Sequence, residues 1–189
     1  MPSVVAGSSS SRPLFGGSIV ADLPASWKDV SDFRQVPDNQ EVFVSPDTDP
    51  NGEASLIVEV LQKVDQTELE AAVRFHFDSI AHDNDAEESH VVRTWSLDGK
   101  PQPMMLSGTQ MVKKFGKDSE ASKWVEIWVA LWRIEGKNVD LVMSVNASGS
   151  GSVSEAGDGE GQSAREGEVA RIFERAASSL SIVDHGLFA

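Results

Sequence analysis

The sequence predicts an α/β fold, in which a largely antiparallel central sheet is covered by helices on both faces as an α/β/α sandwich. The first observation is a series of short apolar segments, separated by turns, that suit strands. The second is a pair of segments, residues 65–84 and 163–180, with apolar side chains at helical spacing. The third is residues 124–134, a strand that is apolar on both faces and suits the middle of a sheet.

The composition is that of a single globular domain. The chain has 189 residues, of which 40% are apolar and 24% charged, enough for one well-buried core. Residues 1–13 lack the basic start and long apolar stretch of a signal peptide, and we expect them to be a disordered tail. Residues 14–189 are expected to form the domain.

Seven segments are predicted to be strands. They are short apolar runs punctuated by proline and glycine, at residues 15–22, 42–44, 56–61, 91–97, 104–115, 124–134 and 139–145. Gly16 and Gly17 are expected at a bend or bulge of the first strand. Residues 45–54 contain two prolines and a glycine, so they are predicted to form a loop.

Two helices are predicted from capping residues and apolar stripes. Asp65 and Glu68 have the spacing of an N-cap and N3 pair, and Ser163 and Glu166 form a capping box. The first stripe is Leu69, Ala72, Val73, His76, Phe77 and Ile80, and the second is Val169, Ile172, Phe173, Ala176 and Leu180. His76 is interpreted as a partly buried packing residue. Residues 147–163 contain ten Gly or Ser among seventeen, which predicts a flexible loop.

Three tryptophans are ambiguous. Trp124, Trp128 and Trp132 are spaced by four, which suits one face of a helix or one face of a strand. The β-branched residues between them favour a strand buried on both sides. A core strand is the favoured interpretation, and an aromatic binding platform is the alternative.

Charge and motifs exclude several functions. The formal net charge of −14 would repel a nucleic-acid backbone or an anionic membrane, and it favours a partner with a basic protein surface. The chain has no cysteine, and no apolar run approaches the roughly 20 residues that span a bilayer. Neither Gly16-Gly17 nor the histidine spacing matches a phosphate loop or a metal site, and no serine lies in a nucleophile elbow. We therefore expect no cofactor, no metal and no covalent chemistry.

Acidic residues concentrate in one part of the chain. Residues 29–59 contain eight acids and a single base, Arg34. Within them, residues 29–44 (DVSDFRQVPDNQEVFV) are dense in polar groups, with Pro37-Asp38-Asn39 expected as a turn. If residues 45 and 55 pair, Glu41 faces Glu59 across a hairpin, a costly arrangement that suggests a basic partner. The alternative is that both carboxylates are simply exposed and serve solubility.

The same stretch carries a resemblance to a known family. Together with Leu14-Phe15-Gly16-Gly17, Leu23-Pro24, residues 55–59 (SLIVE) and Leu187-Phe188, it resembles the Mog-one family of Ran-binding nuclear import factors. The resemblance implies a PsbP-like α/β/α sandwich that binds the small GTPase Ran and promotes release of its guanine nucleotide, mainly GTP. It also implies action in the nucleus and cytoplasm, and we expect a monomer.

The family's Ran-contacting region falls on specific positions of this chain. They are Asp29, Asp32, Arg34, Pro37, Asp38, Asn39, Gln40, Glu41 and Glu59. Gln62 stands where the family usually has a further acid. Arg34 is expected to pin the acidic loop by an internal ion pair, with direct contact to the partner as the alternative. Two other functions stay open: a PsbP-like accessory protein, and an enzyme or small-ligand binder that uses a deep pocket with perturbed carboxylates.

Overall fold

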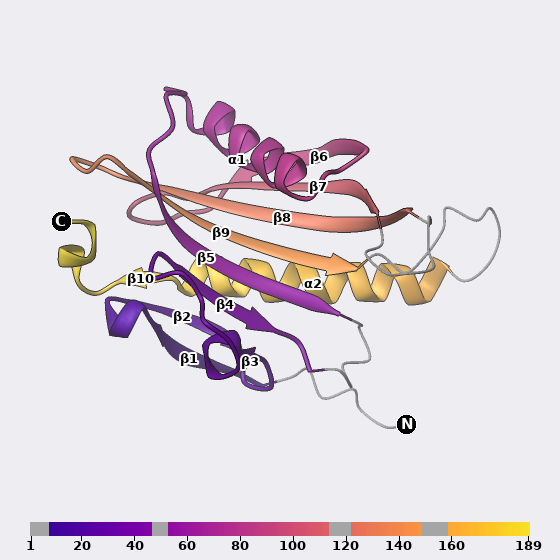
Figure 1. The fold of residues 1–189 in the computed structure, drawn as a ribbon, viewed down its shortest axis with the longest axis horizontal. Coiled ribbons are helices and arrows are strands. Elements are labelled where there is room, and N and C mark those ends of the chain that lie inside the picture. The colour runs from indigo at the N-terminus through magenta and orange to yellow at the C-terminus, as the bar shows by residue number, and fades with distance from the viewer. Residues whose placement is uncertain (1–7, 47–52, 114–121, 149–158) are drawn as a thin grey trace.

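The computed structural model describes residues 8–46, 53–113, 122–148 and 159–189 (Figure 1). Strands, 3-10 helices (η) and α-helices follow one another as β1 (Ser9–Leu14), η1 (Phe15–Gly17), β2 (Ile19–Pro24), β3 (Lys28–Asp29), η2 (Val30–Asp32), β4 (Gln40–Val44), β5 (Ala54–Gln62), α1 (Leu69–Asp83), β6 (Glu88–Ser96), β7 (Met104–Lys113), β8 (Ser122–Ile134), β9 (Val139–Ser148), α2 (Gly159–Ser179), β10 (Ser181–Ile182) and η3 (His185–Phe188).

The main sheet has seven strands in the order β3-β4-β5-β9-β8-β7-β6, and its neighbouring strands are antiparallel. Helix α1 packs against β6, β7 and β8 on one face (Figure 1). Helix α2 packs against β8 and β9 on the other face, where a small sheet of order β1-β2-β10 also lies against it. The predicted α/β fold, with a largely antiparallel sheet between two helices, is confirmed.

Each face of the main sheet carries its own hydrophobic cluster. On the α1 face, Phe77 and Val73 of the helix pack with Val129 and Leu131 of β8. On the α2 face, Phe173 packs with residues of β5, β8 and β9 and of the small sheet. Strand β8 contributes to both clusters, which is why its sequence is apolar on both parities.

The tryptophans of β8 lie in a strand, as predicted. Trp132 is only 3% exposed and belongs to the α2-face cluster, and Trp128 packs against the same cluster beside Phe173. Trp124 is half-buried near the start of β8, with its ring centroid 5.7 Å from that of His90. The interpretation as core residues therefore holds for Trp128 and Trp132, whereas Trp124 lies at the margin of the core.

The expected N-terminal tail and first strand were partly wrong. Ser9–Leu14 form β1, which pairs with β2 along its whole length, and only residues 1–7 of the expected tail lie outside the described residues. Residues 15–17 form η1 rather than strand. Gly16 and Gly17 have φ of 63° and 94°, a conformation that glycine adopts without strain, so the expected bend is present. The serine run hid β1 because it has little apolar periodicity.

Both expected helix caps were misplaced. Helix α1 begins at Leu69 with Glu68 at its N-cap and no side-chain capping bond, so Asp65 lies outside the helix. Helix α2 begins at residue 159, so Ser163 and Glu166 lie inside it rather than at its start. The expected loop of residues 147–163 is thereby shortened at both ends, since β9 also extends to Ser148. Residues 149–158 lie outside the described residues.

Candidate partner-binding site

The acidic stretch forms one edge of the main sheet, where β3, η2 and β4 meet. Asp29 caps η2, because its Oδ1 accepts hydrogen bonds from the backbone nitrogen of Ser31 at 2.8 Å and from its hydroxyl at 2.7 Å. The side chain of Val30 is buried, and its carbonyl oxygen accepts from the backbone nitrogens of Phe33 and Arg34, both at 3.0 Å. This local network fixes the backbone that presents residues 31–35, all of which are exposed.

The turn at Pro37-Asp38-Asn39 forms as predicted. The backbone nitrogen of Gln40 donates to the carbonyl oxygen of Pro37 at 2.9 Å. Asn39 continues the strand pairing, because its carbonyl accepts from the nitrogen of Val60 at 2.9 Å and its Nδ2 donates to the Val60 carbonyl at 3.3 Å. The exposed side chains of Pro37, Asp38 and Asn39 are thereby held beside the end of β5.

The expected pairing of Glu41 with Glu59 is wrong. In the structure Gln40 lies opposite Glu59, and Glu41 lies opposite Val58. The hairpin closes between Ser45 and Ala54, with the Ser45 nitrogen donating to the Ala54 carbonyl and the Ala54 nitrogen donating to the Ser45 hydroxyl, each at 2.9 Å. That closure shifts the register by one residue, and a one-residue shift moves a side chain to the opposite face.

Glu59 lies on the α1 face of the sheet. Its Oε1 accepts a hydrogen bond from Nε2 of Gln40 at 2.6 Å. Burial raises the pKa of Glu59 above its ordinary value; the Gln40 hydrogen bond and His76 oppose that shift, and the like charge of Asp83 adds to it. Glu59 is thus a half-buried carboxylate with an acidic neighbour, an environment that a cation from a partner would stabilise.

Glu41 lies on the other face, toward the small sheet. Its Oε1 accepts a hydrogen bond from the backbone nitrogen of Phe15, which joins η1 to β4. Burial raises the pKa of Glu41, the Phe15 hydrogen bond lowers it, and the like charge of Asp29 raises it further. Glu41 therefore bonds to the backbone of a segment distant in sequence, whereas Glu59 bonds to the Gln40 side chain on the neighbouring strand.

Arg34 does not form the internal ion pair that we expected. Its side chain is exposed, and no ion pair joins it to any other residue in the described ranges. A cation thus stands among the exposed acids without neutralising any of them by direct contact. It is available to contact a partner.

A buried ionic network behind the site was not predicted. Asp140 is fully buried; its carboxylate contacts Nε2 of His76 at 3.0 Å and Nε and Nη2 of Arg133 at 2.8 and 3.1 Å, and it accepts from the Val64 nitrogen at 3.1 Å. Burial alone would raise the pKa of Asp140, but the hydrogen bonds from His76, Arg133 and Val64 hold it well below its usual range.

This network connects α1 to the middle of the sheet. His76 is buried, as the apolar stripe indicated, but it is an ion-pair partner as well as a packing residue. Arg133 and Asp140 are opposite one another on β8 and β9. Gly136 marks a turn between the two strands, and a hairpin around this turn was the sequence signal that could have revealed the pairing of Arg133 with Asp140.

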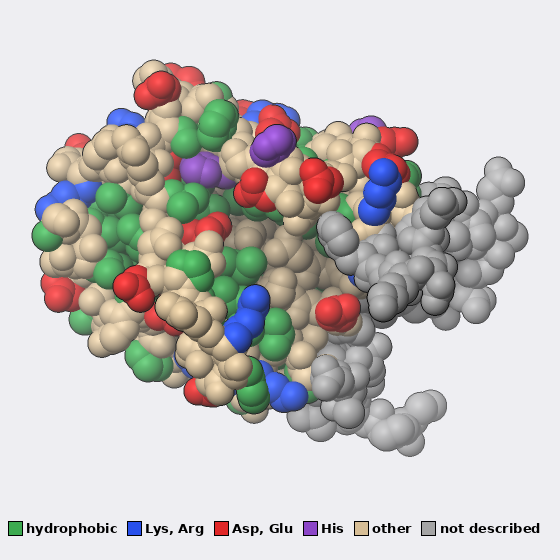
Figure 2. Space-filling model, viewed as in Figure 1, with side chains coloured by type: hydrophobic (Ala, Val, Ile, Leu, Met, Phe, Trp, Pro, Cys, Tyr) green, Lys and Arg blue, Asp and Glu red, His purple; other side chains and the backbone are tan. Residues whose placement is uncertain are grey.

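Figure 2 shows the α1-bearing face of the molecule, with carboxylates spread over it and hydrophobic side chains exposed in a hollow between α1 and strands β4 and β5.

The described residues contain no cluster of three His, Cys, Asp or Glu able to hold a metal. Among the same residues, no helix is both long and apolar enough to cross a membrane.

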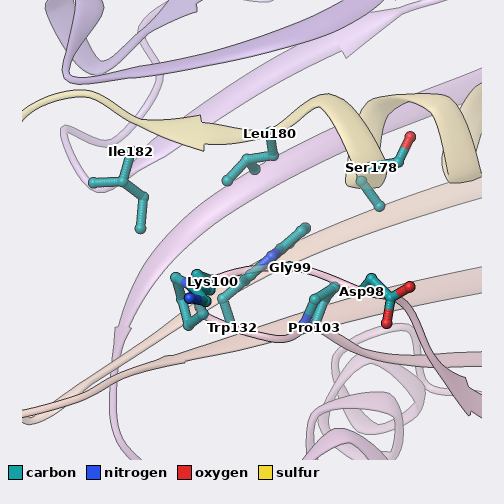
Figure 3. A pocket seen from close by; sticks show the side chains of 10 residues that line it. Asp98, Gly99, Lys100, Pro103, Trp132, Ser178, Leu180 and Ile182 are labelled. Atoms are coloured by element: carbon teal, nitrogen blue, oxygen red, sulfur yellow. The ribbon is translucent and has the colours of Figure 1, made fainter.

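A small pocket lies away from this edge, between the β6–β7 connection and the end of α2 (Figure 3). Trp132 and Lys100 lie on one side of it, and Leu180 and Ile182 of the C-terminal segment lie on the other. Its volume of about 40 Å³ holds about three waters at roughly 10–15 Å³ each. Neither carboxylate with a raised pKa, Glu41 or Glu59, lines it. The pocket therefore lacks the features of the small-ligand site that the sequence left open.

Comparison with known proteins identifies the family of this chain. The family model described as "Ran-interacting Mog1 protein" matches residues 12–148. The Ran guanine nucleotide release factor of Homo sapiens is 39% identical over 142 residues, which cover 71% of this chain and 73% of that protein. The corresponding factor of Danio rerio is 36% identical over 146 residues, covering 72% and 76%.

Solved structures extend the similarity to nearly the whole chain. The crystal structure of the Saccharomyces cerevisiae Ran-binding protein Mog1p superposes with a TM-score of 0.74 at 26% identity, covering 96% of this chain and 99% of that one. A mutant of Mog1 superposes with a TM-score of 0.78 at 26% identity, covering 96% and 100%. By sequence and by fold, the chain belongs to the Mog1 family of Ran-interacting proteins.

Proposed function

We propose that this protein binds the GTPase Ran and promotes release of its guanine nucleotide, in support of nuclear protein import. The observation that carries the proposal is the match of residues 12–148 to the Ran-interacting family, together with relatives whose names state guanine nucleotide release or nuclear import. The exposed acidic edge at β3, η2 and β4 supplies a surface suited to a basic partner.

The proposed contact surface follows the residues assigned from the sequence, with one change of role. Asp29, Asp32, Arg34, Pro37, Asp38, Asn39, Gln40 and Glu59 are proposed to contact Ran. Glu41 is proposed to position this edge, because its carboxylate already accepts the Phe15 hydrogen bond. Acidic side chains on the rim would steer a basic surface of Ran into place and speed association.

The proposed action is non-covalent. A protein that binds more tightly to a Ran state with weakened nucleotide contacts must, by linkage, weaken nucleotide binding by the same factor. This requires no bond-making group in the protein, so the proposal is a release factor and not an enzyme. We further propose that it acts on the GTP form, as a monomer, in the nucleus and cytoplasm.

The test is release of a fluorescent guanine nucleotide from purified Ran, loaded separately with a GTP or a GDP analogue, with and without this protein. Faster release, greater for the GTP analogue, is the expected result. Binding without faster release would leave a role in sequestering Ran and overturn the release function. Absence of both would overturn the proposal and show that family membership preserves only the fold.

A further inference from the structure

The partner-facing edge carries an exposed aromatic side chain that its acidic character does not explain. Phe33 is 70% exposed, the largest exposed fraction among the large hydrophobic residues that the structure describes. The neighbouring side chains of Ser31, Asp32, Arg34 and Gln35 are all exposed and polar. A phenylalanine at the centre of such a run contributes little to the core, so the fold does not account for it.

The backbone holds this side chain in a defined place. Phe33 follows η2 directly, and its nitrogen donates to the carbonyl of Val30, a residue that is only 6% exposed and so is anchored in the protein. Asp29 caps the other end of η2 through the Ser31 nitrogen. An aromatic ring has few rotatable bonds, so presenting it from a fixed turn lowers the entropy cost of binding.

The surroundings match those of an interface anchor. Apolar anchors at protein interfaces are typically aromatic and are ringed by polar contacts that exclude water once the complex forms. Asp32 and Arg34 flank Phe33 in the chain, and both are exposed. Because acids outnumber the single base Arg34 throughout residues 29–41, the complementary surface is an apolar recess bordered by lysine or arginine.

We propose that Phe33 is the apolar anchor of the Ran complex and inserts into an apolar recess on Ran that is bordered by basic side chains. This inference rests on the proposed function, because it names a residue and a contact type for the same complex. The acids set the encounter rate and its salt dependence, whereas Phe33 slows dissociation. The two contributions can be separated by experiment.

The experiment measures the Kd and rate constants for Ran with wild type, Phe33→Ala and Phe33→Leu at several salt concentrations. The binding free energy gained by burying a phenylalanine side chain predicts a roughly 10- to 100-fold loss of affinity for Phe33→Ala, mainly through faster dissociation. Its salt dependence should match that of wild type, and Phe33→Leu should recover most of the affinity. Thermal unfolding should be unchanged, because the side chain is largely exposed.

Val92→Ala is the matched control. Val92 is 69% exposed at a bulge in β6, and β6 and β3 are at opposite edges of the main sheet. It should bind Ran like wild type. If wild type binds and Phe33→Ala binds equally well, the anchor is overturned while the proposed function stands. If wild type itself does not bind Ran, both are overturned.

Discussion

Glu59→Gln is expected to weaken Ran binding without destabilising the fold. The substitution removes one negative charge and keeps an oxygen that can accept the hydrogen bond from Gln40 Nε2, now 2.6 Å from Glu59 Oε1. Because burial raises the pKa of Glu59, the folded protein disfavours the charged form relative to a neutral one. The neutral amide should therefore be at least as stable at pH 7 as the carboxylate.

The expected loss of affinity follows from the type of contact. A hydrogen bond to a charged group contributes about 1.5–3 kcal/mol, which corresponds to a roughly 10- to 150-fold rise in Kd. The Tm should stay within about 2 °C of wild type or rise. Since the folded pKa lies above the ordinary 4.5, ionisation costs stability as pH rises past it, so any gain in Tm should vanish below about pH 4.5.

Calorimetric titration with Ran and thermal unfolding of the same sample give the two quantities. Glu135→Gln is the control, since it makes the same charge change at an exposed position just after β8. An unchanged Kd in the folded Glu59 variant would remove Glu59 from the interface. A fall in Tm of more than about 5 °C would show instead that the ionised carboxylate stabilises the fold, against the direction of its pKa shift.

Three further outcomes are expected. Asp38→Lys should slow association with Ran and reduce the salt dependence of the association rate. Asp98→Lys makes the same charge change at an exposed site that lines the small pocket, and it should have neither effect. Equal effects of the two variants in stopped-flow mixing would mean that only net charge matters. Glu41→Gln should retain stability, while Glu41→Ala leaves the Phe15 nitrogen without its acceptor and should cost about 1–3 kcal/mol in urea unfolding. Asp140→Asn should lower the free energy of unfolding by about 3–5 kcal/mol. Because the folded pKa of Asp140 is lowered, this difference from wild type is fully present above about pH 4 and should shrink as the pH falls further. A difference that stays constant down to about pH 2 would refute the ionic character of the network.

The strands and helices were largely predictable because each has a clear apolar period. The ends of these elements were not. Helix α2 begins before the residues that looked like its cap, since Ser163 and Glu166 fit the interior of a helix as well as its start. β1 was missed because a strand of the small sheet can be mostly polar and so shows little apolar periodicity. Five of its six residues are not fully buried.

The chemistry of the acidic edge was predictable in composition but not in geometry. The sequence placed Glu41 and Glu59 on neighbouring strands, and the structure separates them onto opposite faces through a single Ser45–Ala54 closure. No local pattern distinguishes a hairpin that closes at 45–54 from one that closes at 45–55. The turn at Gly136 could have indicated that Arg133 and Asp140 pair, but the burial of Asp140 could not be predicted, because it also depends on His76 reaching it from α1.

The small sheet joins segments from near both ends of the chain, which limits how far the chain can be shortened. β2 is bonded on one side to β1 and on the other to β10, so segments near the two ends of the chain share one central strand. This arrangement acts as a non-covalent clasp that closes most of the chain into a ring and restricts its conformational entropy. Removing Ser9–Leu14 would leave in place the β2–β10 pairing that closes this ring, but it would expose the other edge of β2 and so invite self-association.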